Sequence, residues 1–306
     1  MAEIRYVKHK DIDQEKWDRS IDRSYNGLVY AYSFMLNRMA NGRWDALIQG
    51  DYEAVFPLAW NRKFGLAYLY QPYLCQQLGL FSITKITPLQ LQNFIYAIPR
   101  RFRYWKFHLN AENQFFHPKI SFLNRTTYQI SLQQDYTNIY DLYNSDAKKN
   151  LAKAAISGFE VKKDIEVDLV IDCFKHAYGS FYPNDPKLYK RISDCEQDAI
   201  RIKKGFTRGI YGRDGQRWCA GFFFMAKGMI HYAMAAPTEE GKKYGATHIL
   251  IDEVLKEFAG QNLTFDFEGS DIKSVAYFYS KFGSRPQHYL EITNNLLPWW
   301  CRFLKK

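Results

Sequence analysis

An acidic run in the second half of the sequence, Phe265-Asp266-Phe267-Glu268-Gly269, contains the residue types that acid–base chemistry requires. Alternate side chains of a β-strand share a face, so both carboxylates are expected on one side of a strand here. A carboxylate in this position can accept a proton from an incoming amine, or hold the ammonium form of that amine. A solvated strand end or the cap of a following helix gives the same pattern. Asp266 and Glu268 are therefore candidate catalytic residues, with the structural alternative open.

A predicted helix follows this run and carries Tyr279 and Lys281. These side chains can stabilise a developing oxyanion or position an acyl donor, or they can serve packing and surface charge only. Tyr232 lies in an earlier predicted strand between Ala233 and Ala235, whose small side chains leave room for a ligand or for a closely packed helix. Tyr279 is the third candidate catalytic residue, and Tyr232 and Lys281 are candidate donor-binding residues.

Basic residues near two predicted helix starts suit a phosphate-rich donor. Lys148, Lys149 and Lys153 share one predicted helix, and Lys242 and Gly245 precede another. Backbone N–H groups at a helix N-terminus attract phosphate. A solvated helix face and an ordinary turn are the commoner explanations for such residues. All five are retained as candidate donor-binding residues.

An uncharged loop in the first half of the sequence, residues 70–79, is rich in amides and aromatics. Its side chains Gln71, Tyr73, Gln76 and Gln77 can read a sugar or a peptide through hydrogen bonds. A loop that merely covers the core has the same composition. These four residues are the candidate acceptor-binding residues.

The bulk composition describes a folded chain without metal or disulfide signatures. The 306 residues are 47% hydrophobic and 24% charged, which provides a sizeable core and argues against disorder. The five cysteines include no CxxC pair and the seven histidines no HxxxH pair, so neither a disulfide framework nor a metal site is predicted. The charged start of the sequence and the lack of a long apolar run predict a reduced, cytoplasmic protein without a membrane span.

The formal net charge of +10 favours anionic partners, namely nucleic acid, phosphate-bearing cofactors or membrane headgroups. Lys and Arg are nevertheless spread along the chain, and the densest clusters, at residues 100–103 and 203–204, are short. Most of this charge is therefore expected on solvated surface.

Turn and cap signals predict two lobes, residues 1–140 and 141–306. In the first lobe, Pro57 places its strand at an edge or a bulge. In the second, Ser145 is the expected N-cap of a helix that stops at Gly158, and a three-strand meander precedes a strand–helix unit, which predicts a mixed sheet with helices on its faces. Helices are predicted from residue 11 and from 145, and over 32–39, 87–98, 167–181, 186–203, 245–258 and 272–282. Strands are predicted over 3–8, 43–49, 53–61, 66–70, 104–109, 126–131, 159–163, 207–211, 217–226, 229–236, 263–267 and 287–293.

Three segments of the second lobe resemble the FemAB-like branch of the GNAT acyltransferases, the tandem-GNAT aminoacyltransferases that build peptidoglycan cross-bridges. Residues 148–154 look like the basic helix that opens the family's second GNAT unit. Residues 265–270 look like its strand and acidic-Gly turn, and residues 275–283 look like its closing helix. The strands of the first lobe and the Gln71-Pro72 loop fit the family's first unit less specifically.

The resemblance implies an α/β (α+β) fold of two tandem GNAT-like lobes, each a mixed, mostly antiparallel sheet flanked by helices. It implies an acyl- or aminoacyl-transferase acting on an amine of a peptide, sugar or small molecule, with acyl-CoA or aminoacyl-tRNA as donor, in a bacterial cell-wall context. Direct transfer is expected, because no Cys–His or Ser–His constellation is visible.

The sequence departs from the family pattern at two places. The family commonly has a Lys where this chain has Tyr279, and Lys281 follows two residues on. The loop of acetyl-CoA-dependent relatives has its best match at residues 242–247, which fails at the first and last positions. A ligand-binding protein that retains the tandem fold is therefore the alternative hypothesis. Nucleic-acid binding is a further alternative that rests on the net charge alone.

Overall fold

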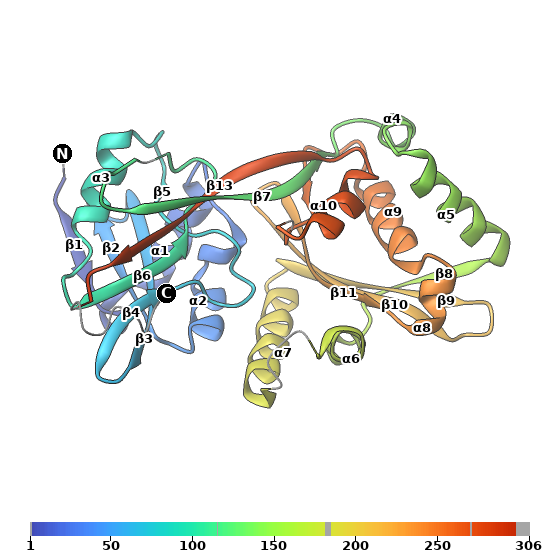
Figure 1. Cartoon of the computed structure of the whole chain (residues 1–306), viewed down its shortest axis with the longest axis horizontal. Coiled ribbons are helices and arrows are strands. Elements are labelled where there is room, and N and C mark those ends of the chain that lie inside the picture. The colour runs from blue at the N-terminus through green and yellow to red at the C-terminus, as the bar shows by residue number, and fades with distance from the viewer. Residues whose placement is uncertain (1, 115, 181–184, 270, 298–306) are drawn as a thin grey trace. The chain divides into compact units, whose positions relative to one another are not determined.

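The computed structural model describes residues 2–114, 116–180, 185–269 and 271–297. Contacts within the chain group it into two compact units (Figure 1). Unit 1 comprises Met1–Thr126 and His288–Lys306, and unit 2 comprises Thr127–Gln287. The sequence-based boundary was at 140/141. The observed division falls earlier, and it assigns the C-terminal segment to the first unit because that segment is a strand of the first sheet.

Unit 1 is built on a mixed sheet with the strand order β1-β2-β3-β4-β6-β13. Neighbouring strands are antiparallel except for β4 and β6, which are parallel. Helix α3 supplies apolar side chains to the core on one face of this sheet. The elements are β1 (Ile4–Val7), α1 (Gln14–Arg23), α2 (Ser33–Met39), β2 (Trp44–Gln49), β3 (Ala54–Lys63), β4 (Leu66–Tyr70), β5 (Phe81–Ser82), α3 (Pro88–Tyr96), β6 (Phe102–His108) and β13 (Arg285–Asn295).

Pro57 lies inside β3 rather than at the edge of the sheet. On one side β3 pairs with β2 in unbroken register from Ala54 to Ala59. On the other side it pairs with β5 up to Val55 and with β4 only from Trp60. Residues 56–59 therefore pair with no described strand on that side, and a residue without an N–H group is tolerated in this gap.

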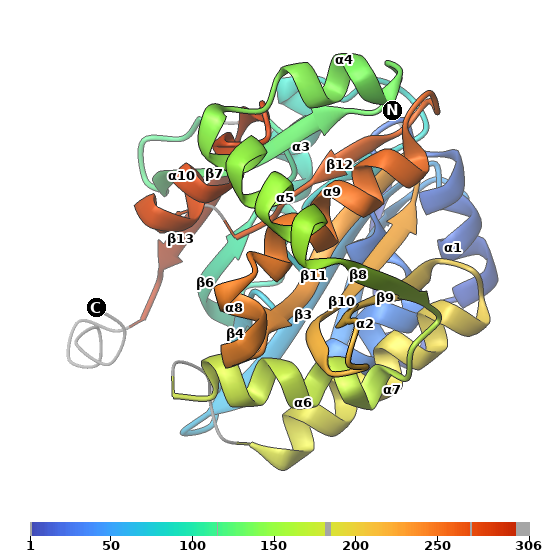
Figure 2. The ribbon, with the colours of Figure 1, turned by 90° about the vertical axis from the view of Figure 1, so that its right-hand side faces the viewer.

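Unit 2 repeats the same plan, with the strand order β7-β12-β11-β10-β9-β8. Its neighbouring strands are antiparallel except for β11 and β12. Helices α9 and α10 lie on one face of the strands and α6 and α7 on the other (Figures 1 and 2). The elements are β7 (Ser121–Ser131), α4 (Tyr136–Asp141), α5 (Ser145–Ser157), β8 (Phe159–Lys163), α6 (Val167–Tyr178), α7 (Pro186–Arg201), β9 (Gly205–Gly212), β10 (Arg217–Ala226), β11 (Met229–Pro237), α8 (Glu239–Lys243), α9 (Ala246–Phe258), β12 (Thr264–Asp266) and α10 (Lys273–Ser280).

The predicted helices and strands are confirmed within a few residues, and local chemistry explains the differences. Asn144, not Ser145, is the N-cap of α5, because its side chain accepts a hydrogen bond from the N–H of Ala147. Gly158 ends α5 as predicted, with a φ of 71°. Helices α4 and α8 were missed, since both are short.

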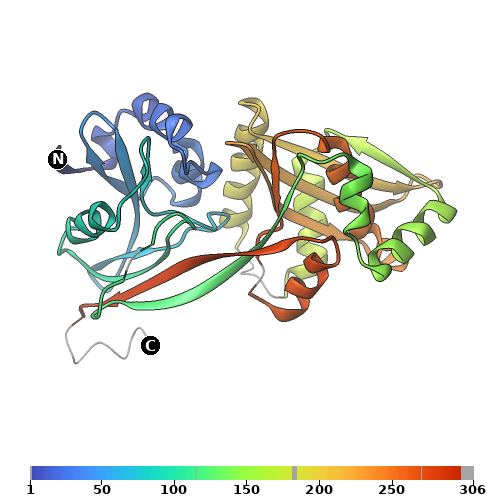
Figure 3. The same cartoon turned by 90° about the horizontal axis from the view of Figure 1, so that it is seen from above.

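Two long strands carry the chain across the division between the units. Strand β7 begins in unit 1 and ends in unit 2, whereas β13 begins in unit 2 and ends in unit 1 (Figure 3). The core of unit 2 gathers aromatic and aliphatic side chains of β10–β12, α9 and α10. None of the described helices combines the length and the apolar content that crossing a bilayer requires.

Candidate functional site

The parallel pair β11 and β12 separates partway along unit 2. The two strands pair only at Met229–Thr264, Ile230–Phe265 and His231–Asp266. Strand β11 continues to Pro237 and stays paired with β10 on its other side. Its residues 232–237 therefore present backbone N–H and C=O groups that no described strand pairs on the β12 side. Unpaired strand groups of this kind can bind an extended ligand. We call this separation the fork.

Asp266 lies at the fork but is fully buried. Its carboxylate accepts hydrogen bonds from the Thr127 hydroxyl, from Gln129 Nε2 at 2.8 Å and from the backbone N–H of Glu268 at 2.8 Å. These donors satisfy both carboxylate oxygens without solvent. Asp266 therefore fixes the turn that follows β12, rather than offering a free basic group.

Glu268 follows β12 instead of continuing it, so the expected strand alternation of the two carboxylates is wrong. Its φ of 54° lies in the left-handed region, which is uncommon for a non-glycine residue. This turn brings Glu268 Oε1 to 3.7 Å from Nδ1 of His231. Only 13% of the Glu268 side chain is exposed. A nearly buried carboxylate thus stands beside an imidazole where the strands part.

His231 is a neutral partner for this carboxylate. Its side chain is 1% exposed, and burial lowers its pKa to about 4 against the opposing charge of Asp266. The imidazole is therefore uncharged at neutral pH. A neutral imidazole has one N–H donor and one acceptor nitrogen, so His231 offers Glu268 a polar neighbour without a positive charge.

The candidate residues Tyr232 and Tyr279 lie close together in unit 2, near Phe267. The rings of Tyr232 and Tyr279 are 6.1 Å apart and roughly perpendicular, and the Tyr279 ring is 4.9 Å from that of Phe267. Burial raises the pKa of Tyr232 well above its usual value. The Tyr232 hydroxyl is therefore protonated at neutral pH, and both rings pack in the aromatic core of unit 2.

Lys281, the candidate nearest to the lysine of the family pattern, is bound elsewhere. Its Nζ is 2.5 Å from Asp146 Oδ2, which joins the end of α10 to the first turn of α5. Hydrogen bonding to Lys281 lowers the pKa of Asp146. The backbone carbonyl of Lys281 also accepts a hydrogen bond from Asn144. Lys281 therefore holds two helices together.

The other candidate donor-binding lysines also have internal contacts, with one exception. Lys153 Nζ donates to the Lys243 carbonyl at 2.9 Å, and Lys242 pairs with Glu239 at 2.6 Å. Lys148 Nζ lies 5.1 Å from the centre of the Tyr140 ring. Lys149 is exposed, and it forms no hydrogen bond or ion pair with the described residues. Gly245 has a φ of 65° and begins α9.

The loop of unit 1 that carries the candidate acceptor-binding residues, 70–79, leaves the sheet at the end of β4. Pairing of β4 with β6 ends at Tyr70–Lys106 and resumes only at the Leu78–Leu109 bridge. Gln71 spans this interval, because its Oε1 accepts the His108 N–H at 2.9 Å and its amide nitrogen donates to the Cys75 carbonyl.

Gln77 is likewise committed, since its Oε1 accepts from the Ala111 N–H at 3.0 Å. Gln76 Nε2 is buried without a hydrogen-bond partner among the described residues, and the Tyr73 side chain is 45% exposed. Gln71 and Gln77 thus anchor the loop to the sheet. Tyr73 and Gln76 keep polar groups with which a ligand can bond.

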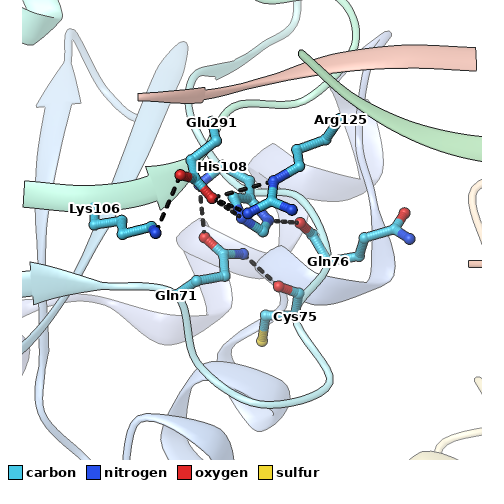
Figure 4. Close-up of polar contacts among 7 residues, drawn as sticks. All are labelled: Gln71, Cys75, Gln76, Lys106, His108, Arg125 and Glu291. Carbon is cyan, nitrogen blue, oxygen red and sulfur yellow. Dashed lines mark hydrogen bonds and ion pairs between the residues drawn. The ribbon is translucent and has the colours of Figure 1, made fainter. Parts of the chain in front are cut away.

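A charged cluster that the sequence did not reveal lies beside this loop (Figure 4). Glu291 on β13 is 4% exposed and receives Arg125 at 2.5 Å, Lys106 at 3.3 Å and His108 Nε2 at 3.3 Å. The other ring nitrogen of His108 faces the Gln76 carbonyl at 2.9 Å.

The electrostatics of this cluster follow from its burial. Burial would raise the pKa of Glu291, but hydrogen bonds and charge from Arg125 and Lys106 outweigh it and hold that pKa below its usual value. Burial lowers the pKa of His108. Arg125 and Glu291 are 166 residues apart, so no local spacing signals their contact.

An open pocket of about 480 Å³ lies close to this cluster in unit 1. Tyr289, one of its lining residues, packs its ring 5.6 Å from that of His108. The described lining has no Lys, Arg, Asp or Glu: Pro88, Asn110, Ala111, Asn113, Gln114, Phe116, Asn124, His288, Tyr289 and Leu290. In no part of the described chain do three His, Cys, Asp or Glu side chains gather as a metal ion would require.

These features define the class of fold. Two units, each with a parallel strand pair in a mostly antiparallel sheet flanked by helices, form the FemAB-like, GNAT-type acyltransferase fold. FemX matches this chain with a TM-score of 0.67 at 9% identity, over 91% of this chain and 96% of FemX. L-PGS from Bacillus licheniformis matches with a TM-score of 0.56 at 10% identity, over 95% of each chain.

A third solved structure has the same fold. The C-terminal domain of a protein assigned as a lysylphosphatidylglycerol synthetase from Agrobacterium fabrum matches with a TM-score of 0.57 at 11% identity, over 95% of this chain and 94% of that domain. No protein-family model matches the sequence, and no curated protein matches it. At such identities the likeness is one of fold.

Proposed function

We propose that the protein is an acyl- or aminoacyl-transferase that moves an acyl group directly onto an amine at the fork of unit 2. The observation that carries this proposal is the separation of β11 from β12 after His231, with Glu268 at the point of divergence. The likeness in fold to FemX and L-PGS supports it. Acyl-CoA and aminoacyl-tRNA are the donor classes, and the acceptor is an amine of a peptide, sugar or small molecule.

In the proposed reaction the donor acyl chain extends along the free edge of β11. The amine nitrogen attacks the acyl carbon, the new C–N bond forms, and the amine proton passes to the Glu268 carboxylate. The C–S bond of a thioester, or the C–O bond of an aminoacyl ester, breaks, and the leaving group takes up the proton that Glu268 accepted, which restores the Glu268 carboxylate. Catalysis then rests on positioning and proton removal, without a covalent enzyme intermediate. Tyr279 and Tyr232 shape the apolar side of the fork.

The donor and acceptor roles of the remaining candidates are proposals of unequal support. Lys149 and the α9 N-terminus at Gly245 are the groups best able to meet a donor phosphate, since Lys148, Lys153, Lys242 and Lys281 have internal contacts. In unit 1, Tyr73 and Gln76 are the loop residues that we assign to acceptor recognition.

Glu268→Gln tests the chemistry. We expect this variant to fold normally and to lose roughly 10²- to 10⁴-fold in single-turnover transfer, the usual contribution of a general base. The assay uses a panel of acyl-CoAs and aminoacyl-tRNAs with a panel of primary amines. Glu240→Gln is the matched control, because Glu240 pairs with Lys243 on the surface. Transfer by Glu268→Gln at the rate of the control would remove Glu268 from the mechanism.

A binding protein without catalysis is the second candidate, favoured by the internal contacts of the donor-side lysines. Thermal shift separates the two functions. Stabilisation by an acyl-CoA or an aminoacyl-tRNA supports the transferase, whereas stabilisation only by peptides or glycans supports the binding protein.

A further inference from the structure

The hairpin between β3 and β4 ends in a largely exposed aromatic side chain. Phe64 is 77% exposed at the turn. Its φ is 49° and that of Gly65 is 76°, so both turn residues have positive φ. Two-residue hairpin loops of this kind favour Asn-Gly, and a phenylalanine there is held in an unfavourable backbone region. The turn thus displays a large apolar ring at a position where the backbone preference is against one.

The topology of the sheet brings a second basic segment to the same end of unit 1. Because β4 and β6 are parallel and Ala67 pairs with Phe102, the residues that precede β6 lie beside the hairpin turn. This segment is the 100–103 cluster of the sequence. Arg101 within it is bound to Asp45 at 2.6 Å and lies over the ring of Phe102.

The neighbouring cations have no such partner. Arg62, Lys63, Arg100 and Arg103 are exposed, and none pairs with a carboxylate of the described residues. Lys63 Nζ lies 5.5 Å from the centre of the Phe64 ring. We call these cations together with Phe64 the basic tip.

We propose that the basic tip docks the protein on an anionic lipid surface. The ring of Phe64 enters the interface, while the four cations remain at the level of the lipid phosphates. Aromatic side chains favour the membrane–water boundary, and basic side chains near it are attracted by anionic headgroups. The proposal does not depend on the transfer chemistry at the fork.

The geometry favours lipid over nucleic acid as the partner. Proteins that bind single strands set their aromatic rings inside a basic groove, where successive bases stack on them. Phe64 instead stands at the apex of a hairpin, with its cations behind it on β3 and at the start of β6. A protruding apolar ring with a basic surround matches a surface that is anionic outside and apolar beneath.

Co-sedimentation of the full chain with vesicles tests the proposal. We expect binding to vesicles of phosphatidylcholine mixed with phosphatidylglycerol, little binding to phosphatidylcholine alone, and loss of binding at high salt. Phe64→Asn should weaken binding about tenfold or more, the effect of removing one buried aromatic ring. Asn-Gly is a favoured turn pair, so this variant keeps the hairpin. Phe116→Asn is the matched control, since Phe116 is 81% exposed in unit 1.

Charge reversal provides the second arm. Arg62→Glu with Lys63→Glu, and separately Arg100→Glu with Arg103→Glu, should each weaken binding by at least about 25-fold, which is about fivefold for each cation lost. Arg23→Glu with Lys85→Glu is the control pair, because Arg23 at the end of α1 and Lys85 just after β5 are exposed and do not belong to the basic tip. Equal binding to both kinds of vesicle, or full binding by Phe64→Asn, would overturn the proposal. So would binding of a single-stranded oligonucleotide, with no vesicle binding, that needs the cations but not Phe64.

Discussion

Folding keeps His231 uncharged at pH values where a histidine in the unfolded chain is protonated, and this makes the free energy of unfolding depend on pH. Burial lowers its pKa to about 4 from 6.5. Between these pH values the unfolded chain binds a proton at this position and the folded chain does not. The free energy of unfolding therefore falls as the pH is lowered through this window. A buried histidine shifted this far contributes on the order of 3 kcal/mol to that fall.

His231→Gln should flatten this dependence. We expect the variant to lose less stability than the wild type between pH 6.5 and 4, whatever its stability at neutral pH. His248, whose pKa burial also lowers to about 4, keeps part of the slope. Urea unfolding across the pH range measures the effect. His176→Gln, at an exposed position on α6, is the control. An unchanged slope in His231→Gln would show that His231 titrates alike in both states.

The sequence located the acidic residues at the fork but not their separate roles. Asp266 and Glu268 look equivalent in the pattern, since both alternate with phenylalanine. The left-handed φ at Glu268 and the donors from Thr127 and Gln129 make them different. Those donors are more than 130 residues away along the chain, so only the folded sheet distinguishes the surroundings of the two carboxylates.

At the scale of elements, α8 shows how closely a helix can lie against a strand. Gly241 on α8 packs so tightly on β10 that a Cβ atom at this position would lie 1.9 Å from the Trp218 carbonyl oxygen. The neighbour is backbone, which cannot rotate away. Thr238 begins the helix by accepting the Gly241 N–H at 3.0 Å. Gly241 is therefore required for the packing of α8 on β10.

Gly241→Ala should push α8 away from β10 and lower the free energy of unfolding by about 3 kcal/mol, the upper range for overpacking. Gly215→Ala is the control. Its φ of 76° carries a backbone penalty of about 1 kcal/mol, but nothing lies within 4 Å of an added Cβ. Denaturant unfolding of both variants gives the comparison. Equal losses would mean that α8 shifts freely on the strand.

Most elements follow from the sequence because local signals fix them. The hairpin glycines Gly215 and Gly228, both with positive φ, delimit the meander, and Thr87 with Pro88 begins α3 as predicted. The cluster around Glu291 does not follow, because its members lie on β6, β7 and β13, and β13 is far from the other two strands in sequence. The local sequence shows only that Glu291 is a charged residue within a predicted strand.

At the scale of the molecule, the unit boundaries show that unit 1 needs the C-terminal strand β13 for its fold, whereas unit 2 does not. Unit 2 is one continuous segment, whereas unit 1 needs β13 to pair with β6 from Glu291–His108 to Asn295–Tyr104. A chain ended after Gln287 should keep unit 2 folded and leave β6 without its partner. Hydrogen exchange should then show protected amides in β9 and β10 and unprotected ones in β6. A chain ended after Leu297 is the control, and protection of β6 in the shorter chain would contradict the expectation.

The place of β13 in the first sheet also affects how the protein is made. His108 and Glu291 are 183 residues apart, so a ribosome adding about 5–20 residues per second needs roughly 10–40 s to go from one to the other. During that time β6 has emerged, but the edge that β13 will occupy is bare. Such an edge can pair with other chains. The nascent protein therefore passes through a stage at which the unfinished first sheet is open to pairing with other chains.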